Sequence, residues 1–396
     1  MPEIVEPLND RASGPGLDPA VARSGRGSTR LTACVESLTE SMQEEWERLA
    51  DDLAAPCFLR PGWVDAWAKA FCRRPVRVLC VRRQGEVVGL LPFVDRLRVR
   101  RSPTNWHTPM FSFLVRDHEA RTALADALIG HARTSVDLSF LDRGDPSLQA
   151  CLQASRASRT QALVWTLVRS PWVDLSGGDW NSFCSALAPK VRKELRRLRR
   201  RLDEQGTVGV EFSDGSDELE ALLREGFSAE GSGWKERRGT AITSDPRTER
   251  FYTEIAGWAA SRGELVLAFL RLDGRPIAFD LCIESRGGVY PLKGGFDPAF
   301  RRYGPGMLLT YESLRRAFAR GLATYELLGD SDPYKLVWTQ TVRERVRFQA
   351  FDVGSPAGAV GWLTGALYSL AWTHGRPVLH SIRATVAQRR PAGRRR

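Results

Sequence analysis

The sequence predicts a mixed α/β (α+β) protein that is built from two similar halves. Three observations lead to this prediction. The 396 residues suit two domains better than one core. A hairpin phrase appears twice in the chain, and a glycine-rich turn stands between a predicted strand and a predicted helix. With 42% hydrophobic and 27% charged residues, the composition is typical of a soluble globular protein.

The N-terminal segment and the cysteines indicate in which cellular compartment the protein resides. Residues 1–30 lack the apolar core of a signal peptide, so we predict a disordered leader. The seven cysteines are scattered and never spaced as CxxC. This pattern favours reduced thiols in the cytoplasm over a disulfide framework or a zinc site, and we expect no metal.

The first half, 31–172, opens with predicted helices over 41–54 and 62–71. Its hairpin phrase "VLCVRRQGEVVG" (78–89) returns as "LAFLRLDGRPIA" (267–278). Each phrase puts a polar-glycine turn between apolar strands and follows an aromatic-rich helical segment. The repetition indicates a duplication, although unrelated hairpins also share such a phrase. A cluster of Pro, Gly and Ser over 170–178 marks the boundary.

The second half, 173–352, begins with a strongly basic helix. Its apolar residues Val191, Leu195, Leu198 and Leu202 recur at helical spacing. Eight cations and one acid occupy 190–201. The pattern fits either a solvated helix face or a helix that holds an anionic partner.

The glycine-rich turn follows a predicted strand over 287–293. A helical pattern runs from Met307 and stops at Gly321, so the helix begins at Gly304-Pro305-Gly306. The amides at a helix start have no partner in the helix, and with the helix dipole they favour phosphate. An ordinary turn between strand and helix is the alternative. The residues that we expect at this anion site are Arg301, Arg302, Gly304, Gly306 and Lys293.

Residues 301–306 fit R/Q-x-x-G-x-G/A and resemble the pyrophosphate loop of GNAT acyltransferases. Together with "SGWKERRGT" (232–240), "YPLKGGFDPAFRRYGPGMLL" (290–309) and "LLGDSDPYKLVW" (327–338), they resemble the acetyltransferase family associated with bacterial cellulose and exopolysaccharide synthesis. That family has the GNAT fold and is related to the Fem peptidyl transferases. The resemblance is strongest over 180–350. It implies tandem GNAT-like halves, each a mixed, mostly antiparallel sheet flanked by helices, with one acyl-CoA site in the second half.

The resemblance also implies a reaction. An acetyl group would pass from acetyl-CoA to an amine or hydroxyl of a sugar, a polysaccharide precursor or a small molecule. The pantetheine arm would lie between the strands 287–293 and 324–328, where a strand amide stabilises the oxyanion. Trp234 and Lys235, with Trp338, would bind the acceptor.

Four residues are candidates for the chemistry. Asp280 stands alone on an apolar strand, and Asp330 follows the second strand. Tyr334 can protonate the leaving thiolate, and Lys335 can hold an anionic group or the oxyanion. Each also has a structural explanation without a catalytic role. Asp280 could be an outward-facing acid on an edge strand, and Asp330 a helix cap. Tyr334 could pack against Trp338, and Lys335 could be solvent-exposed. None of the five histidines lies in these motifs, which argues against a histidine triad or a histidine metal site.

Two other functions remain open. One is a Fem-like transfer from aminoacyl-tRNA, with the basic helix on the RNA backbone, and the other is a non-catalytic protein that binds acyl-CoA or another anion. The phosphate loop favours acetyl-CoA, because aminoacyl-tRNA carries no pyrophosphate. Nucleic acid is therefore a less favoured partner.

The segment 353–396 is predicted to be a helical extension with an arginine-rich tail. Val353 to Thr373 carries no charge, and seven arginines without an acid follow, which supply over half of the net charge of +11. Its proline, glycines and serines favour a packed or interfacial helix over a membrane span. We therefore expect a cytoplasmic protein with peripheral contact at the inner membrane face.

Overall fold

The computed structural model describes residues 30–96, 98–130, 135–158, 160–231 and 242–388, and side chains up to residue 373. The predicted leader up to residue 29 lies outside these residues, as do Trp234 and Lys235.

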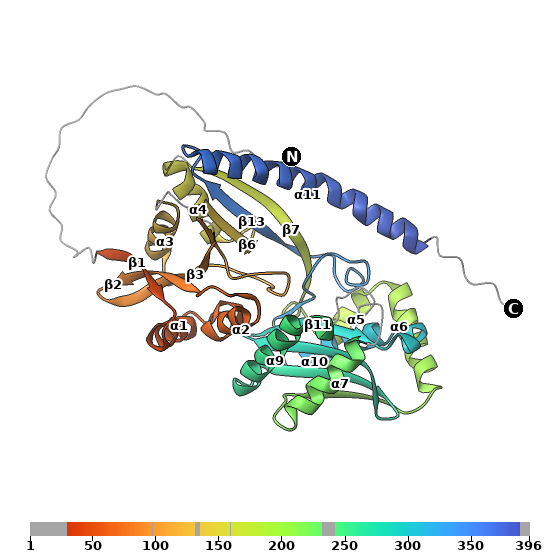
Figure 1. Ribbon diagram of the computed structural model, residues 1–396. Helices are drawn as coiled ribbons and strands as arrows, with labels where there is room; N and C mark the ends of the chain where they lie inside the picture. Colours follow the sequence, from red (N-terminus) through yellow and green to blue (C-terminus); the bar gives the residue numbers. More distant parts are fainter. Residues whose placement is uncertain (1–29, 97, 131–134, 159, 232–241, 389–396) are drawn as a thin grey trace, which may run out of the picture.

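Runs of strands and helices follow one another along the chain (Figure 1). The first half contains β1 (Leu31–Ser37), α1 (Glu40–Asp52), α2 (Pro61–Phe71), β2 (Arg77–Arg83), β3 (Glu86–Arg96), β4 (Val99–Arg101), β5 (Leu114–Val115), α3 (His118–Gly130), β6 (Ser135–Asp142), α4 (Pro146–Ala157) and β7 (Gln161–Asp174). The second half contains α5 (Trp180–Ala186), α6 (Pro189–Asp203), β8 (Val208–Ser213), α7 (Leu219–Gly231), α9 (Pro246–Ser261), β9 (Leu265–Leu272), β10 (Arg275–Ser285), β11 (Gly288–Phe296), α10 (Pro305–Ala319), β12 (Thr324–Glu326) and β13 (Val342–Phe351). The last helix is α11 (Pro356–Gln388), and short 3-10 helices stand at Cys57–Leu59, Ile242–Ser244 and Pro298–Tyr303.

All of these strands belong to one mixed sheet. Their order is β1-β2-β3-β4-β6-β13-β7-β12-β11-β10-β9-β8, with β5 beside β3. Neighbouring strands are antiparallel except for β4 with β6 and β11 with β12. The predicted fold class, mixed and mostly antiparallel sheets flanked by helices, is confirmed.

The two ends of the sheet repeat the same arrangement. The order β1-β2-β3-β4-β6 corresponds to β8-β9-β10-β11-β12, with the parallel pair in the same place. The turn glycines of the two hairpins have positive φ angles, 88° at Gly85 and 80° at Gly274, which suits tight hairpin turns. The preceding helices α2 and α9 pack together, with the rings of Trp63 and Phe251 edge-on at 5.5 Å. The repeated phrase is therefore a repeated structural unit.

One strand from the end of the second half, β13, pairs within the first half of the sheet, which the predicted boundary did not anticipate. β7 pairs with β13 over residues 161–171 and with β12 over 172–174. β13 lies between β6 and β7, although the prediction placed residues 342–351 in the second half. Strand pairing thus assigns β13 to the first half, and the predicted boundary at residue 172 falls inside β7.

Helix α11 lies along β7 and β13 (Figure 1). The indole of Trp372 donates a hydrogen bond from Nε1 to the carbonyl oxygen of Thr166 at 3.1 Å, which fixes the helix to β7. Among the described residues, no helix has the length and apolar character that crossing a bilayer requires.

Candidate functional site

A cleft opens where β11 and β12 separate. The two strands pair only at Gly288 with Thr324 and at Val289 with Tyr325. Beyond these pairs lies a cleft of about 760 Å³, lined by residues of β11, the start of α10 and the segment after β12, and by Trp106, His107 and Phe140 of the first half. The predicted residues Asp280, Lys293, Arg301, Gly304, Gly306, Tyr334, Lys335 and Trp338 all line it.

The turn before α10 presents main-chain amides to this cleft. Gly304 has φ 59° and ψ 46°, a left-handed conformation that favours glycine, and Pro305 occupies the first helical position. The N–H of Gly304 is bonded to the carbonyl of Arg301 at 3.1 Å, and that of Leu308 to the carbonyl of Gly304 at 3.1 Å. The amides of Gly306 and its successor have no acceptor within the helix, as at any helix start. The Gly304 amide closes the turn, so of the predicted anion site only the amides of residues 306 and 307 are left to face a ligand.

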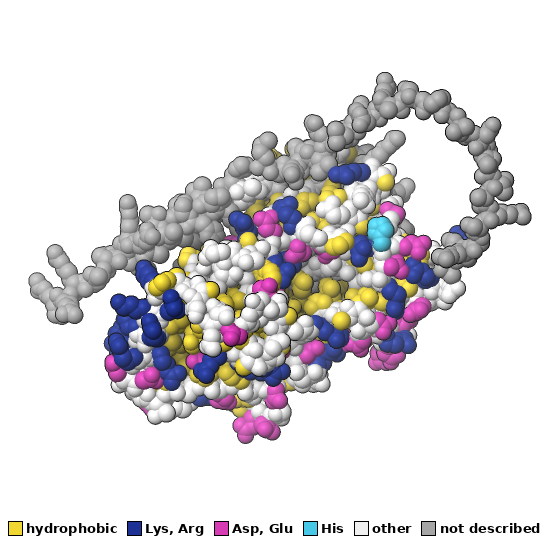
Figure 2. Space-filling model, turned by 180° about the vertical axis from the view of Figure 1, so that it is seen from behind, with side chains coloured by type: hydrophobic (Ala, Val, Ile, Leu, Met, Phe, Trp, Pro, Cys, Tyr) yellow, Lys and Arg dark blue, Asp and Glu magenta, His cyan; other side chains and the backbone are white. Residues whose placement is uncertain are grey.

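The basic helix α6 packs behind this turn. A Cβ on Gly304 would lie 2.7 Å from Cδ1 of Leu198, so the glycine lets α6 approach. Arg201 lies over the ring of Tyr303 at 5.8 Å, and Arg302 lies over the same ring at 4.7 Å. Arg302 is not among the residues that line the cleft, whereas Arg301 is. Figure 2 shows dark-blue side chains gathered at the end of the molecule where Figure 1 places α6.

Lys293 lies in a buried polar cluster that spans the two halves. Its Nζ is 4.0 Å from Oε1 of Glu230, a residue that is only 2% exposed. The other carboxylate oxygen of Glu230, Oε2, accepts a hydrogen bond from the Ile242 amide at 3.0 Å. Nδ1 of His107 is 3.0 Å from the hydroxyl of Tyr252. Burial, and next the charge of Lys293, lowers the pKa of His107 to about 4, so this imidazole is neutral at neutral pH.

Sequence reasoning missed Glu230 and His107. Glu230 ends the amphipathic helix α7, and His107 stands in a loop of the other half, so neither belongs to a motif. The stretch "EGFSAEG" (225–231) holds two glutamates, and nothing in it marks Glu230 as the buried one.

Asp280 and Tyr334 both line the cleft. Asp280 lies on β10 opposite Gly294 of β11, where a Cβ would be 1.6 Å from its Oδ1. Gly294 therefore makes room for this carboxylate. Tyr334 is 66% exposed, but it stands within the cleft, where the surrounding protein and then the charges of Asp332 and Asp280 raise the pKa of its hydroxyl. The hydroxyl stays protonated and can donate a proton.

Asp330 and Lys335 hold the segment after β12 in place. Oδ1 of Asp330 accepts the Arg169 amide at 3.2 Å, and Asp330 does not line the cleft. Nζ of Lys335 donates to the carbonyls of Leu328 at 2.8 Å and Asp330 at 3.1 Å, and lies 3.2 Å from the carboxylate of Asp332. Burial lowers the pKa of Lys335. Its three ammonium protons thus have partners inside the protein, which suits a positioning residue better than a ligand for the acceptor.

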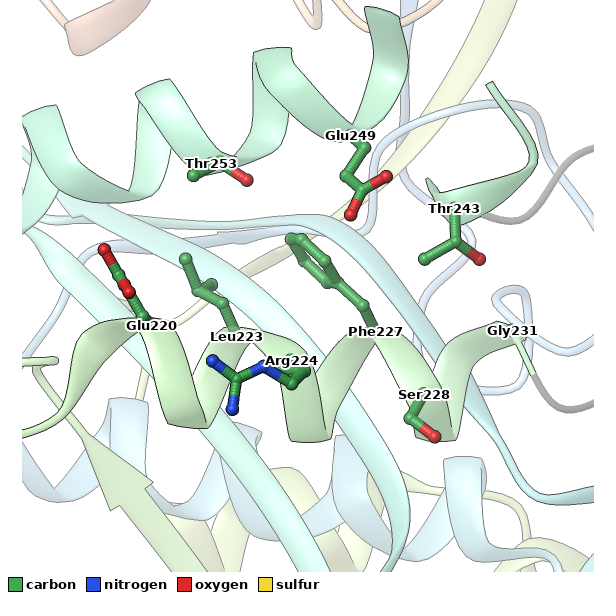
Figure 3. A pocket seen from close by; sticks show the side chains of 9 residues that line it. All are labelled: Glu220, Leu223, Arg224, Phe227, Ser228, Gly231, Thr243, Glu249 and Thr253. Carbon is green, nitrogen blue, oxygen red and sulfur yellow. The ribbon is translucent and has the colours of Figure 1, made fainter. Parts of the chain in front are cut away.

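A second hollow lies between α7 and α9 (Figure 3). It measures about 590 Å³, and its polar side chains include Glu220, Arg224 and Glu249. None of the predicted site residues that the structure describes lines it.

Residues 189–336 match the family model of the acetyltransferase (GNAT) domain. The matched range runs from α6 to the segment after β12 and includes most of the residues that line the cleft, but not those of the first half. The protein has the GNAT acyltransferase fold. No curated protein sequence matches the chain.

Two solved structures extend the GNAT likeness over both halves. A domain (DUF2156) described as the C-terminal part of a lysylphosphatidylglycerol synthetase from Agrobacterium fabrum is 15% identical, with a TM-score of 0.51 over 82% of this chain and 95% of its own. FemX is also 15% identical, with a TM-score of 0.51 over 80% of this chain and 96% of its own. At this identity they show a shared fold. The acyltransferase assignment is supported by the family match over residues 189–336.

Proposed function

We propose that the protein transfers an acetyl group from acetyl-CoA to an amine or hydroxyl of a sugar, a polysaccharide precursor or a small molecule. One observation carries the proposal. The helix start at Gly306 and Met307 opens into the cleft between the separated strands β11 and β12, with Arg301 beside it. A diphosphate suits this place because it meets free amides, the positive helix end and a guanidinium together.

The unpaired edge of β11 could form main-chain hydrogen bonds with the pantetheine arm of the cofactor. Beyond Val289, the edge of β11 that faces away from β10 is not paired with β12, and residues 291–296 line the cleft. The register of β10 and β11 shifts at Leu281/Cys282, which leaves Leu292 outside the ladder as a bulge. We assign the amides around this bulge to the thioester carbonyl, where they would stabilise the oxyanion.

In the chemical step, the acceptor nitrogen or oxygen attacks the thioester carbonyl carbon. A C–N or C–O bond forms, the C–S bond breaks, and the acceptor loses a proton while the thiolate of CoA gains one. Asp280 is the candidate that accepts the proton, and Tyr334 is the candidate that protonates the thiolate, because both line the cleft and one stays protonated.

The acceptor would enter along an aromatic wall. Trp338 and Trp106 line the cleft, with Trp338 5% exposed and Trp106 63% exposed. The exposed ring of Trp106 suits the apolar face of a sugar, whereas Trp338 is buried in the core and would support the wall from behind. Trp234 and Lys235 remain proposals for the same acceptor, and a carbohydrate of cellulose or exopolysaccharide synthesis remains the family-based choice.

A second candidate is transfer from aminoacyl-tRNA. The position of the basic helix α6 directly behind the phosphate loop favours it, because a nucleic-acid backbone could follow both. Binding of uncharged tRNA at several salt concentrations separates the two proposals. A steep loss of affinity with salt and no binding of acetyl-CoA would support the tRNA substrate.

The test of the main proposal is release of free CoA thiol. Purified protein is mixed with acetyl-CoA and a panel of amino sugars, sugars and amines, and the thiol is measured with a chromogenic disulfide. Acceptor-dependent release that Asp280→Asn diminishes would support the proposal. Tight binding of acetyl-CoA without acceptor-dependent release would contradict it and favour a non-catalytic acyl-CoA-binding protein.

A further inference from the structure

Helix α11 is apolar on two opposite faces. Its inner face packs on β7 and β13 through Trp362, Ala366 and Trp372. Gly365 also lies on this face, where a Cβ would be 2.9 Å from Oε1 of Gln349. The inner side of the helix is therefore covered by the sheet, and the outer side is exposed.

The outer face carries a stripe of exposed aliphatic side chains. They are Val360, Leu363, Leu367 and Leu370, which are 62%, 54%, 59% and 39% exposed. Their spacings of three, four and three residues place them in one line along the helix. No charged residue occurs between Val353 and Thr373 to interrupt it. A helix on a protein surface normally presents polar side chains on this side, so the stripe indicates a contact surface.

The charge next to the stripe identifies the partner. The segment from Thr373 to Arg396 contains seven arginines and no acidic residue. A partner for both features must be apolar and anionic, which describes the surface of a bilayer with acidic lipids. We propose that the outer face of α11 docks on such a membrane surface, with the helix parallel to it.

A second copy of the chain fits the stripe less well. Parallel self-association along α11 would bring two arginine-rich segments of the same sign close together, and antiparallel self-association would cover the stripe but leave both arginine-rich segments without an anionic partner. A transmembrane arrangement is also disfavoured, because α11 does not meet the requirements for a span. A surface-bound helix satisfies both observations.

Docking would bring the cleft close to the bilayer. Trp372 on the inner face stacks on Trp106, with ring centres 6.0 Å apart, and Trp106 lines the cleft. The rim at Trp106 would therefore lie beneath α11, one helix diameter (~10 Å) from the bilayer surface.

The test is co-sedimentation of the full chain with vesicles. Phosphatidylcholine vesicles with about 30% phosphatidylglycerol are compared with pure phosphatidylcholine at 0.15 M salt, where charge attraction persists over roughly 8 Å. We expect binding to the acidic vesicles and at least tenfold weaker binding to the neutral ones.

A matched pair of double variants separates the stripe from general charge effects. Leu363→Glu with Leu367→Glu changes two stripe residues that are one helical turn apart. Gln149→Glu with Gln153→Glu adds the same two charges at the same spacing on the exposed side of α4. The first variant should bind acidic vesicles at least tenfold more weakly, and the second should stay within about twofold of the natural chain. Circular dichroism confirms that both are folded.

Two outcomes would overturn the proposal. One is equal binding of both variants, or no binding of the natural chain to either vesicle. The other is a dimer in light scattering that the Leu363/Leu367 variant alone dissociates, which would assign the stripe to a second copy.

Discussion

Replacing Gly306 with glutamate tests whether the turn before α10 holds a diphosphate. A Cβ at this position would lie 3.4 Å from Cδ1 of Phe296, an ordinary contact, so a side chain fits without displacing the backbone. Glutamate is also favourable in the first turn of a helix. Gly306→Glu should therefore fold normally and place a carboxylate where the phosphates of acetyl-CoA would bind.

The size of the effect follows from Coulomb's law. A carboxylate about 5–6 Å from one phosphate charge costs about 3 kcal/mol at an effective dielectric constant of 20. Since about 1.4 kcal/mol corresponds to a tenfold change in affinity, the Kd for acetyl-CoA should rise by roughly a hundredfold.

Isothermal titration calorimetry with acetyl-CoA measures this change. Gly257→Glu is the matched control, because Gly257 lies on α9 and a Cβ there would meet no atom within 4 Å. The control should bind acetyl-CoA like the natural chain. If Gly306→Glu also binds with unchanged affinity, the diphosphate does not lie at this helix start and the reasoning is wrong.

Three further changes probe the cleft. Tyr334→Phe should lower kcat by about a hundredfold with unchanged acetyl-CoA affinity, and equal kcat would show that another group protonates the thiolate. Lys335→Met should lower the free energy of unfolding, measured in urea, by about 1–3 kcal/mol, because the carbonyl of Leu328 and the carboxylate of Asp332 lose their partner. The same variant should lower turnover far more than it lowers the affinity for acetyl-CoA. His107 has a pKa of about 4 in the folded protein against 6.5 normally, so the unfolded chain binds more protons and stability falls as the pH drops from about 6.5 to 4. The natural chain should lose roughly 3 kcal/mol more than His107→Asn over this range, and parallel urea titrations would contradict that.

Local signals predicted the parts of the fold that depend on a few adjacent residues. The turns at Gly85 and Gly274 and the helix start at Gly304 were predicted, because positive φ angles and a helix-initiating proline leave a direct mark in the sequence. The repeated order of strands followed from the same hairpins.

Non-local pairing left no such mark. β13 has the alternation of an ordinary strand, and nothing within residues 342–351 says that it inserts between β6 and β7. In the same way, His107 reaches the cleft only because the halves pack together. Lys335 was predicted to hold an anionic group or the oxyanion, and its sequence neighbours gave no sign that its ammonium has three partners inside the protein.

The placement of β13 also bears on how the nascent chain matures. Until residue 351 has left the ribosome, β6 and most of β7 lack the strand that separates them, and both present open edges. The sheet of the first half therefore cannot be completed before the second half has been synthesised. This departs from the usual order, in which the N-terminal part of a chain folds first. The strands β8–β12 of the second half, by contrast, can pair with one another before β13 is synthesised, so the sheet of the first half is completed last.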